Sequence, residues 1–305
     1  YPDDLDARIA LAQIAFAATN WEELERHASQ AAALAPEDQR VLPLTTARNY
    51  RTAVVANDAS ARSDAAREAT ALLVDQPDNL VLRSVIIDDL LRSGDLQAAL
   101  MEIDAMLQRD PDNVLYHQQR LNILAQSGDM DGLEGQLRIM IARFPEDTVH
   151  KATLLRFFLS RDDLDAAEAF LRDLVAEASN EDLTARGDLI RFLAEYRSIN
   201  AAKEEIAATV ATVADPLPFL IIDAGLNFAT GPRTDAIATM ESALEEYGTS
   251  TEVQTARVTL ARMLLAVGND VGARARVEEV LAEDSTQPEA LKIRSGWLIE
   301  SDQAD

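Results

Sequence analysis

The three histidines are the side chains of this chain best suited to acid–base or metal chemistry at neutral pH. His27, His117 and His150 form no His-x-x-x-His pair, and no HExxH string is present. The strings GxSxG and GxGxxG and the phosphate-binding P-loop are also missing from the sequence. We therefore expect histidines of surface or groove type, no catalytic residues, no bound metal and no cofactor.

Carboxylates are abundant, but their spacing does not favour catalysis or calcium binding. Adjacent acids such as Asp88 and Asp89 cannot share one helix face, so they indicate solvated surface. The string DMDGLE at 129–134 resembles part of a calcium loop. Its glycine comes too early for a twelve-residue loop that closes with glutamate. We expect a turn between helices there instead.

Composition narrows the class of protein further. The 305 residues carry a net charge of −25, so a nucleic-acid partner is not expected. Apolar residues make up 48% of the chain but aromatic residues only 5%, and the abundance of Ala and Leu favours helices. No apolar run reaches the length of a transmembrane helix. The chain has no cysteine, which excludes disulfides and thiolate chemistry.

Prolines divide the chain at a regular interval. Pro2, Pro36, Pro77, Pro111 and Pro145 are separated by 34, 41, 34 and 34 residues. Each is followed by acidic residues or Asn, which are residue types that cap helix N-termini. A second mark lies about 17 residues further on, as in SGDL at 93–96 and SGDM at 127–130. A fixed period of this size predicts one repeated unit, here two helices with a turn inside and a turn after it.

Apolar residues agree with this period. We number each unit from the third residue after its proline. Positions 20, 24 and 27 then form one helix face, with small residues recurring at position 20. Examples are Ala99, Ile103 and Met106 in one unit and Ala167, Leu171 and Leu174 in another.

The 34-residue period, the small residue at position 20, the closing proline and the Gly-Asp turn resemble the tetratricopeptide repeat (TPR) family. The resemblance extends over essentially the whole chain. It implies an all-α, right-handed superhelical solenoid of helix-turn-helix units. Larger residues at position 8, such as Ile87 and Leu121, depart from the family pattern. The expected units are 5–38, 39–79, 80–113, 114–147, 148–181, 182–216, 217–250 and 251–287, with a terminal helix at 288–300.

In the TPR family the first helix of each unit lines the concave face, so the resemblance implies a binding groove there. Position 9 of these helices becomes arginine in the later units, at Arg156, Arg191 and Arg262. We predict a groove for a peptide or protein that carries carboxylates, with apolar contacts from Leu159, Ile221, Phe228, Val258 and Leu265. The alternative is that these arginines pair with acids of neighbouring units. None of the three lysines is followed four residues on by Asn, so the Lys/Asn clamp for terminal carboxylates is not expected.

The expected function is that of a non-catalytic scaffold for a protein or peptide partner. Similar acidic, Ala- and Arg-rich bacterial TPR arrays suggest envelope assembly, with a periplasmic or lipid-anchored location favoured over the cytoplasm. One alternative is the docking or regulatory arm of an enzyme whose catalytic domain lies outside residues 1–305. Another is a self-associating module that forms homo-oligomers through exposed repeat ends. Because both ends interrupt the period, with Tyr1–Asp4 as the tail of a preceding unit, we expect a piece of a longer chain.

Overall fold

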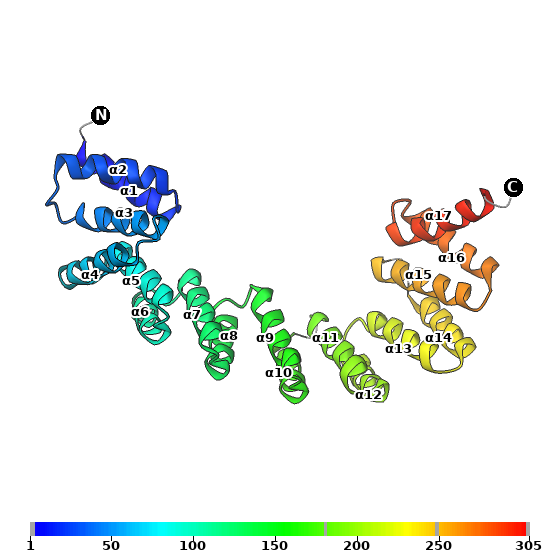
Figure 1. The fold of residues 1–305 in the computed structure, drawn as a ribbon. Coiled ribbons are helices and arrows are strands. Elements are labelled where there is room, and N and C mark those ends of the chain that lie inside the picture. Colours follow the sequence, from blue (N-terminus) through cyan, green and yellow to red (C-terminus); the bar gives the residue numbers. More distant parts are fainter. Residues whose placement is uncertain (1–3, 180–181, 248–249, 303–305) are drawn as a thin grey trace. The chain divides into compact units, whose positions relative to one another are not determined.

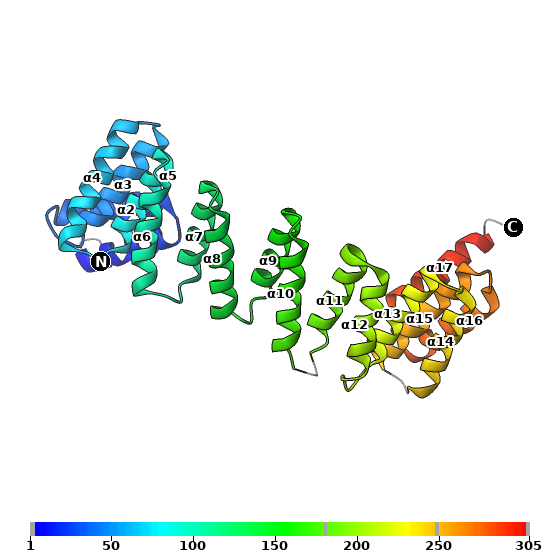
Figure 2. The same ribbon diagram turned by 90° about the horizontal axis from the view of Figure 1, so that it is seen from below.

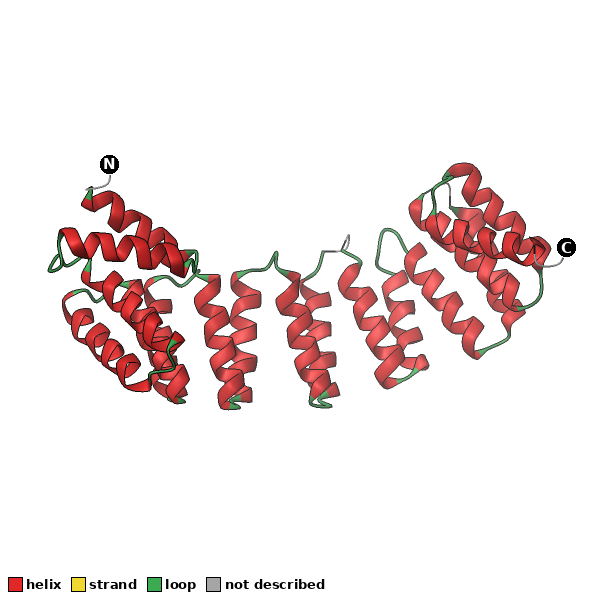
Figure 3. Cartoon of the chain, turned by 45° about the horizontal axis from the view of Figure 1, so that its top comes forward, coloured by secondary structure: helices red, strands yellow, loops and turns green. Residues whose placement is uncertain are grey.

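The computed structural model of the chain describes residues 4–179, 182–247 and 250–302. These residues form seventeen α-helices and one short π-helix, without a strand (Figure 3). The chain separates into two compact units, residues 1–154 and 155–305, and each is described by itself. Within each unit, successive helices pair as antiparallel hairpins (Figure 2).

Unit 1 contains four hairpins and the beginning of the next helix (Figure 1). Its helices are α1 (Leu5–Ala17), α2 (Trp21–Leu34), α3 (Leu42–Val55), α4 (Ala59–Asp75), α5 (Leu80–Ser93), α6 (Leu96–Arg109), α7 (Val114–Ser127) and α8 (Met130–Arg143). The boundary with unit 2 falls inside α9 (Thr148–Ser160).

Unit 2 continues the same pattern. Its elements after α9 are α10 (Leu164–Glu177), α11 (Thr184–Phe192), the π-helix η1 (Leu193–Arg197), α12 (Ile199–Val210), α13 (Leu217–Thr230), α14 (Arg233–Glu246), α15 (Thr251–Ala266), α16 (Asp270–Glu283) and α17 (Pro288–Asp302). One helical hairpin lies within each of the eight predicted ranges, and α17 follows them. The prediction of an all-α fold built from TPR-like hairpins is confirmed.

The recurring acidic strings act as helix caps. Asn79 and Asn113, after the prolines, accept hydrogen bonds from backbone N–H groups in the first turns of α5 and α7. Asp95 and Asp129, after the glycines, do the same for α6 and α8. Asp4, the described end of the predicted Tyr1–Asp4 tail, caps α1, and residues 1–3 lie outside the described part. These side chains satisfy N–H groups that a helix leaves unpaired at its start.

In six of the eight hairpins, the inner turn has one residue in the left-handed backbone region. Gly94, Gly128 and Gly268 occupy it with φ of 80°, 72° and 79°. Thr19, Asn57 and Asp162 hold the equivalent place with φ of 53°, 55° and 56°. A side chain costs energy in this region, and a β-branched one most of all. The geometry of the turn is therefore kept even where glycine is absent.

The hairpin at 182–216 solves the turn differently. No glycine stands at its turn, and α11 runs directly into the π-helix η1. The chain then reaches Ser198 in an extended conformation, with φ of −161°, and its hydroxyl accepts a hydrogen bond from the N–H of Ala201. The missing Gly-Asp string in this part of the sequence thus corresponds to a real change of backbone path.

The extra length of the second predicted unit is also local. Its second helix, α4, has 17 residues, whereas α6 has 14. The rest of the added length lies in the connection before α3 and in the turn after it. Because of these added residues, a position counted from the proline differs from the same position counted from the inner turn of the hairpin. This difference affects a residue of the binding site described below.

Small buried residues allow the two helices of each hairpin to pack closely. At position 20, Ala99, Ala167 and Ala273 are completely buried and Ala236 is nearly so. In unit 1, hydrophobic clusters follow one another along the chain, and in unit 2 one cluster extends from α13 to α17. This is the arrangement expected of a repeat protein, in which each hairpin contacts mainly its neighbours. Among the described residues, no helix is both long and apolar enough to span a bilayer.

Candidate binding site

Two of the three histidines, His27 and His117, are buried between the helices of their own hairpins, so the expected surface or groove position is wrong for both. His117 donates from Nε2 to the carbonyl of Pro111 at 2.8 Å, and its Nδ1 accepts from the Gln136 amide at 2.8 Å. Arg83 holds the equivalent position 34 residues earlier, and it donates to the carbonyl of Pro77. It also pairs with Glu102 on the second helix of its hairpin. Glu102 lies 19 residues after Arg83, and Gln136 lies 19 residues after His117. This is a repeated structural contact that pins the turn after proline.

The other histidines also have packing roles. The Nδ1 atom of His27 lies 3.3 Å from a guanidinium nitrogen of Arg8, and its ring is buried. His150 packs beside the ring of Phe144, with centroids 6.2 Å apart. Within the described ranges, no three His, Asp or Glu side chains are grouped closely enough to hold a metal ion. In the string DMDGLE, Asp129 accepts from the N–H of Gly132 at 2.9 Å, as a helix cap does.

The three arginines of the predicted groove have different surroundings. Arg156, on α9, is exposed and makes no hydrogen bond or ion pair with any residue that the structure describes. Arg191, on α11, contacts Asp188 of its own helix at 2.9 Å, and 73% of its side chain is exposed. Arg262, on α15, pairs with Glu289 of α17. Pairing with acids of neighbouring units, the alternative interpretation, thus applies to Arg262 alone, because Arg191 pairs within its own helix and Arg156 pairs with no described residue.

The predicted apolar groove residues lie largely inside unit 2. Ile221, Phe228 and Leu265 are half-buried and pack against the cluster of α13–α17. Val258 belongs to that cluster and is only 4% exposed, so it contacts its own chain and not a partner. Leu159 is half-buried on α9. On α15, position 5 is therefore a core position and not a groove position.

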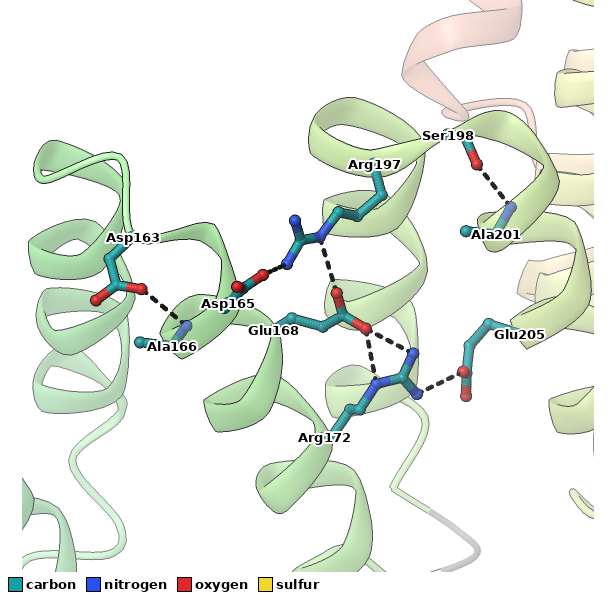
Figure 4. A network of polar contacts seen from close by, with 9 residues as sticks. All are labelled: Asp163, Asp165, Ala166, Glu168, Arg172, Arg197, Ser198, Ala201 and Glu205. Carbon is teal, nitrogen blue, oxygen red and sulfur yellow. Dashed lines mark hydrogen bonds and ion pairs between the residues drawn. The ribbon is translucent and has the colours of Figure 1, made fainter.

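A network of charged side chains joins two neighbouring hairpins of unit 2 (Figure 4). Glu168 on α10 accepts from Arg172 at 2.8 Å and from Arg197 at 2.9 Å, and Arg172 also reaches Glu205 on α12 at 3.0 Å. Burial raises the pKa of Glu168, but the two arginine hydrogen bonds outweigh it and leave this pKa below its usual value. All the carboxylates and guanidinium groups in it are mutually paired, so we interpret the network as packing between hairpins.

An apolar hollow lies in unit 1 among the first helices α1, α3 and α5 and the start of α2. Its volume is about 140 Å³. The side chains that line it are Phe16, Trp21, Ala47, Tyr50, Arg51, Val54, Ser84, Val85, Asp88 and Arg92. Concave, mostly apolar sites with a few polar groups are the usual form of a binding pocket.

The polar wall of the hollow is held rigid by hydrogen bonds. The Tyr50 hydroxyl donates to Asp88 at 2.7 Å, and Arg92 donates to the same carboxylate oxygen at 2.5 Å. Burial, followed by the contact with Asp88, raises the pKa of Tyr50 above its usual value, so the hydroxyl keeps its proton. The contact with Asp88 likewise raises the pKa of Arg92.

The opposite wall is made of aromatic rings and Arg51. The guanidinium carbon of Arg51 lies 4.9 Å from the centre of the Trp21 ring, and Phe16 meets Trp21 edge to face at 6.1 Å. The Arg51 Nε atom is buried and has no hydrogen-bond partner. No carboxylate of the described residues pairs with Arg51.

Comparison with known proteins found structural similarity only, at low sequence identity. No protein-family model matches the sequence. No curated protein matches it significantly. The Naa15/Naa10 structure bound to HypK-THB aligns with 94% of this chain at 12% identity and a TM-score of 0.47; the chain spans 43% of that protein's length. A tetratricopeptide repeat protein from Parabacteroides merdae aligns with 82% of this chain at 15% identity and a TM-score of 0.37, over 97% of its own length. The type IV pilus biogenesis factor PilW aligns with 70% of this chain at 17% identity and a TM-score of 0.37, over 99% of its own length.

The recurring hairpins, their left-handed turns and their asparagine and aspartate caps decide the fold. The chain is a TPR-like helical array. This agrees with the resemblance read from the period and the turn strings.

The TPR-like register also explains why the sequence did not single out the hollow. Counted from its proline, the second hairpin is out of step, because the added residues before α3 displace every position. Counted from the left-handed turn residue, Asn57 corresponds to Gly94, and Arg51 then corresponds to Asp88. Arg51 thus occupies position 9, which Arg156 and Arg262 hold in unit 2. Numbering the second unit from its left-handed turn residue, and not from its proline, would have identified Arg51 as a position-9 arginine.

Proposed function

We propose that this TPR-like array is a non-catalytic scaffold that binds a protein or peptide partner through the first helices of its hairpins. In unit 2, Arg156, Arg191 and Arg262 would pair with carboxylates of the partner. The observation that supports this most directly is the exposed guanidinium of Arg156, which has no carboxylate among the described residues in a chain with 53 Asp and Glu. Arginine forks are well suited to carboxylates because two parallel N–H groups match two oxygens.

The other two arginines are available to the same partner despite their ion pairs. Arg191 and Asp188 are side by side on one helix, and both are substantially exposed. Arg262 and Glu289 are about half exposed. Exposed ion pairs contribute at most about 1 kcal/mol, so a partner's carboxylate could replace the internal one at little cost. Leu159, Phe228 and Leu265 would add apolar contact beside them.

We propose the bacterial envelope, periplasmic or lipid-anchored, as the place to search for this partner. The support is the resemblance of the composition to exported, acidic TPR arrays. Fractionation of the source organism, with antibodies against this chain, tests the proposal. Recovery in the cytosolic fraction alone would contradict it.

The test of the scaffold is a comparison of three proteins as bait for partners from the source organism. One is the unaltered chain, and one carries Arg156→Glu, Arg191→Glu and Arg262→Glu. The matched control carries Arg67→Glu, Arg138→Glu and Arg276→Glu, which change the net charge equally but lie on second helices. We expect mass spectrometry to identify a partner that the unaltered and control baits retain and the first variant loses. Equal retention by all three baits would reject these arginines as the binding surface.

A further inference from the structure

Arg51 differs from the arginines near it because no carboxylate of the described residues pairs with it. Arg62, on the next helix, pairs with Asp89 at 2.7 Å. Arg92, across the hollow, pairs with Asp88 at 2.5 Å. Asp88 also accepts from the Tyr50 hydroxyl, so the only carboxylate lining the hollow is already engaged. A positive charge therefore faces the hollow without compensation from the residues around it.

Several other arginines also have no carboxylate partner in the described part of the chain and cover an aromatic ring instead. Arg161 lies over Phe157, Arg233 over Phe228 and Arg274 over Trp297, at 5.0–5.3 Å. Stacking on a ring attracts a guanidinium but leaves its edge free to donate hydrogen bonds. What distinguishes Arg51 is that its stacked guanidinium borders a partly open apolar hollow and that its Nε is buried and unsatisfied. A buried hydrogen-bond donor without a partner is unfavourable.

The shape of the hollow defines what could occupy it. A volume of about 140 Å³ is close to that of an engineered apolar cavity that binds benzene, so the space suits one phenyl or branched aliphatic side chain. Phe16, Val54 and Val85 supply apolar contact. A cationic ligand is disfavoured because Arg51 and Arg92 flank the site and Asp88 is already paired. A negative group beside the apolar one complements both walls.

We propose that this hollow of unit 1 binds an apolar side chain of a partner peptide, with the carboxylate of an adjacent Asp or Glu paired to Arg51. The contact would put a carboxylate where the chain itself provides none, next to a ring-sized space lined by Phe16 and Trp21. The site is independent of Arg156, Arg191 and Arg262, which all belong to unit 2. It would give the array a sequence preference for an apolar residue followed by an acidic one.

The experiment uses the full chain with Trp297→Phe, which leaves Trp21 as the only tryptophan, since the sequence contains two. The probe is the blocked dipeptide acetyl-Phe-Glu-amide, and Trp21 fluorescence reports its binding. Acetyl-Phe-Gln-amide removes the charge and acetyl-Ala-Glu-amide removes the ring, without altering the protein. We expect saturable binding of the first probe and at least tenfold weaker binding of the other two.

Protein variants then locate the site. Arg51→Gln should weaken binding of acetyl-Phe-Glu-amide at least tenfold. The control Arg67→Gln, an exposed arginine on α4 paired with Asp64, should leave binding unchanged. The triple Arg156, Arg191 and Arg262 variant should also bind the probe normally, which separates this proposal from the proposed scaffold surface. Absence of saturable binding, equal binding of the Gln probe, or unchanged binding by Arg51→Gln would each overturn the proposal.

Discussion

The hairpins of the two units use their aromatic side chains in different ways. In unit 1, Phe16 and Trp21 border a hollow and meet a stacked arginine. In unit 2, Phe158 is only 2% exposed and packs against Phe157 and Phe170, with ring centres 5.7 and 6.3 Å away. One hairpin pattern can thus build either a filled core or an open site. The difference depends on which ring-bearing positions face neighbouring helices.

The largest expected effect comes from removing a ring from each unit. Phe158→Ala should lower the free energy of unfolding by about 3–5 kcal/mol, because it leaves a cavity in a filled core. Phe16→Ala should cost less than about 2 kcal/mol, because Phe16 is half-buried beside a space that already exists. Urea unfolding followed by circular dichroism measures both values. Similar losses in the two variants would show that the hollow is packed as tightly as the core.

Hydrogen exchange sharpens this first comparison. In a repeat array, the effect of a substitution is strongest in its own hairpin and the adjacent ones. Amides of α9 and α10 should therefore lose protection in Phe158→Ala, and amides of α1 and α2 in Phe16→Ala. Uniform loss across the whole chain would instead indicate a single cooperative unit.

A smaller effect is expected from the charge network of unit 2. Glu168→Gln should lower the free energy of unfolding at pH 7 by about 1–2 kcal/mol, a value reduced because both arginines are partly exposed. The folded-state pKa of Glu168 is below its usual value of about 4.5. Its contribution is therefore complete above that value and is lost as pH falls through the lowered folded-state pKa.

Urea titrations at a series of pH values from 7 to 3 measure this contribution. The gap between the unaltered chain and Glu168→Gln should narrow towards pH 3. Glu134→Gln is the matched control in unit 1, since Glu134 contacts only Arg138 of its own helix at 2.9 Å in the described contacts. A gap for Glu168→Gln that stays constant with pH would show that its charge is not what stabilises the packing.

The smallest effects concern the turns that both units share. Thr19→Gly should raise the free energy of unfolding by about 1 kcal/mol, because glycine adopts positive φ without the strain of a β-branched side chain. Asp162→Gly in unit 2 should gain only a few tenths of a kcal/mol, because aspartate tolerates this region better. Thermal unfolding measures both changes. A loss of stability in Thr19→Gly would mean that its side chain makes compensating contacts.

Much of the fold could be predicted from local patterns. The prolines, the Asn and Asp caps and the Gly-Asp turns act over a few residues, so their spacing located the hairpins. In the hairpin that contains η1, the sequence showed only that the Gly-Asp turn string is missing. Its absence indicates a different backbone conformation but does not specify which one. The capping aspartate of DMDGLE could be recognised because a turn and a calcium loop require different spacings.

The candidate sites were less predictable. Arg156, Arg191 and Arg262 share a position on their helices, yet only the folded chain shows that Glu289 reaches Arg262 and that no carboxylate of the described residues reaches Arg156. Val258 occupies a predicted groove position but lies in the core. Because of the extra residues before α3, counting from the proline did not show that Arg51 occupies the same helix position as these arginines. Side-chain partners come from neighbouring hairpins, and a one-dimensional period does not specify which of them are within reach.

The sequence by itself determined the repeat, because helix caps and turns depend on residues that are neighbours along the chain. It also determined that no recognised catalytic motif is present. The tertiary structure alone decided where the repeat leaves space. Phe16, Trp21, Tyr50 and Asp88 come from different helices, and only packing of those helices brings them around Arg51. A hollow is a property of distances between hairpins, and these distances depend on how side chains of separate units fill the volume between them.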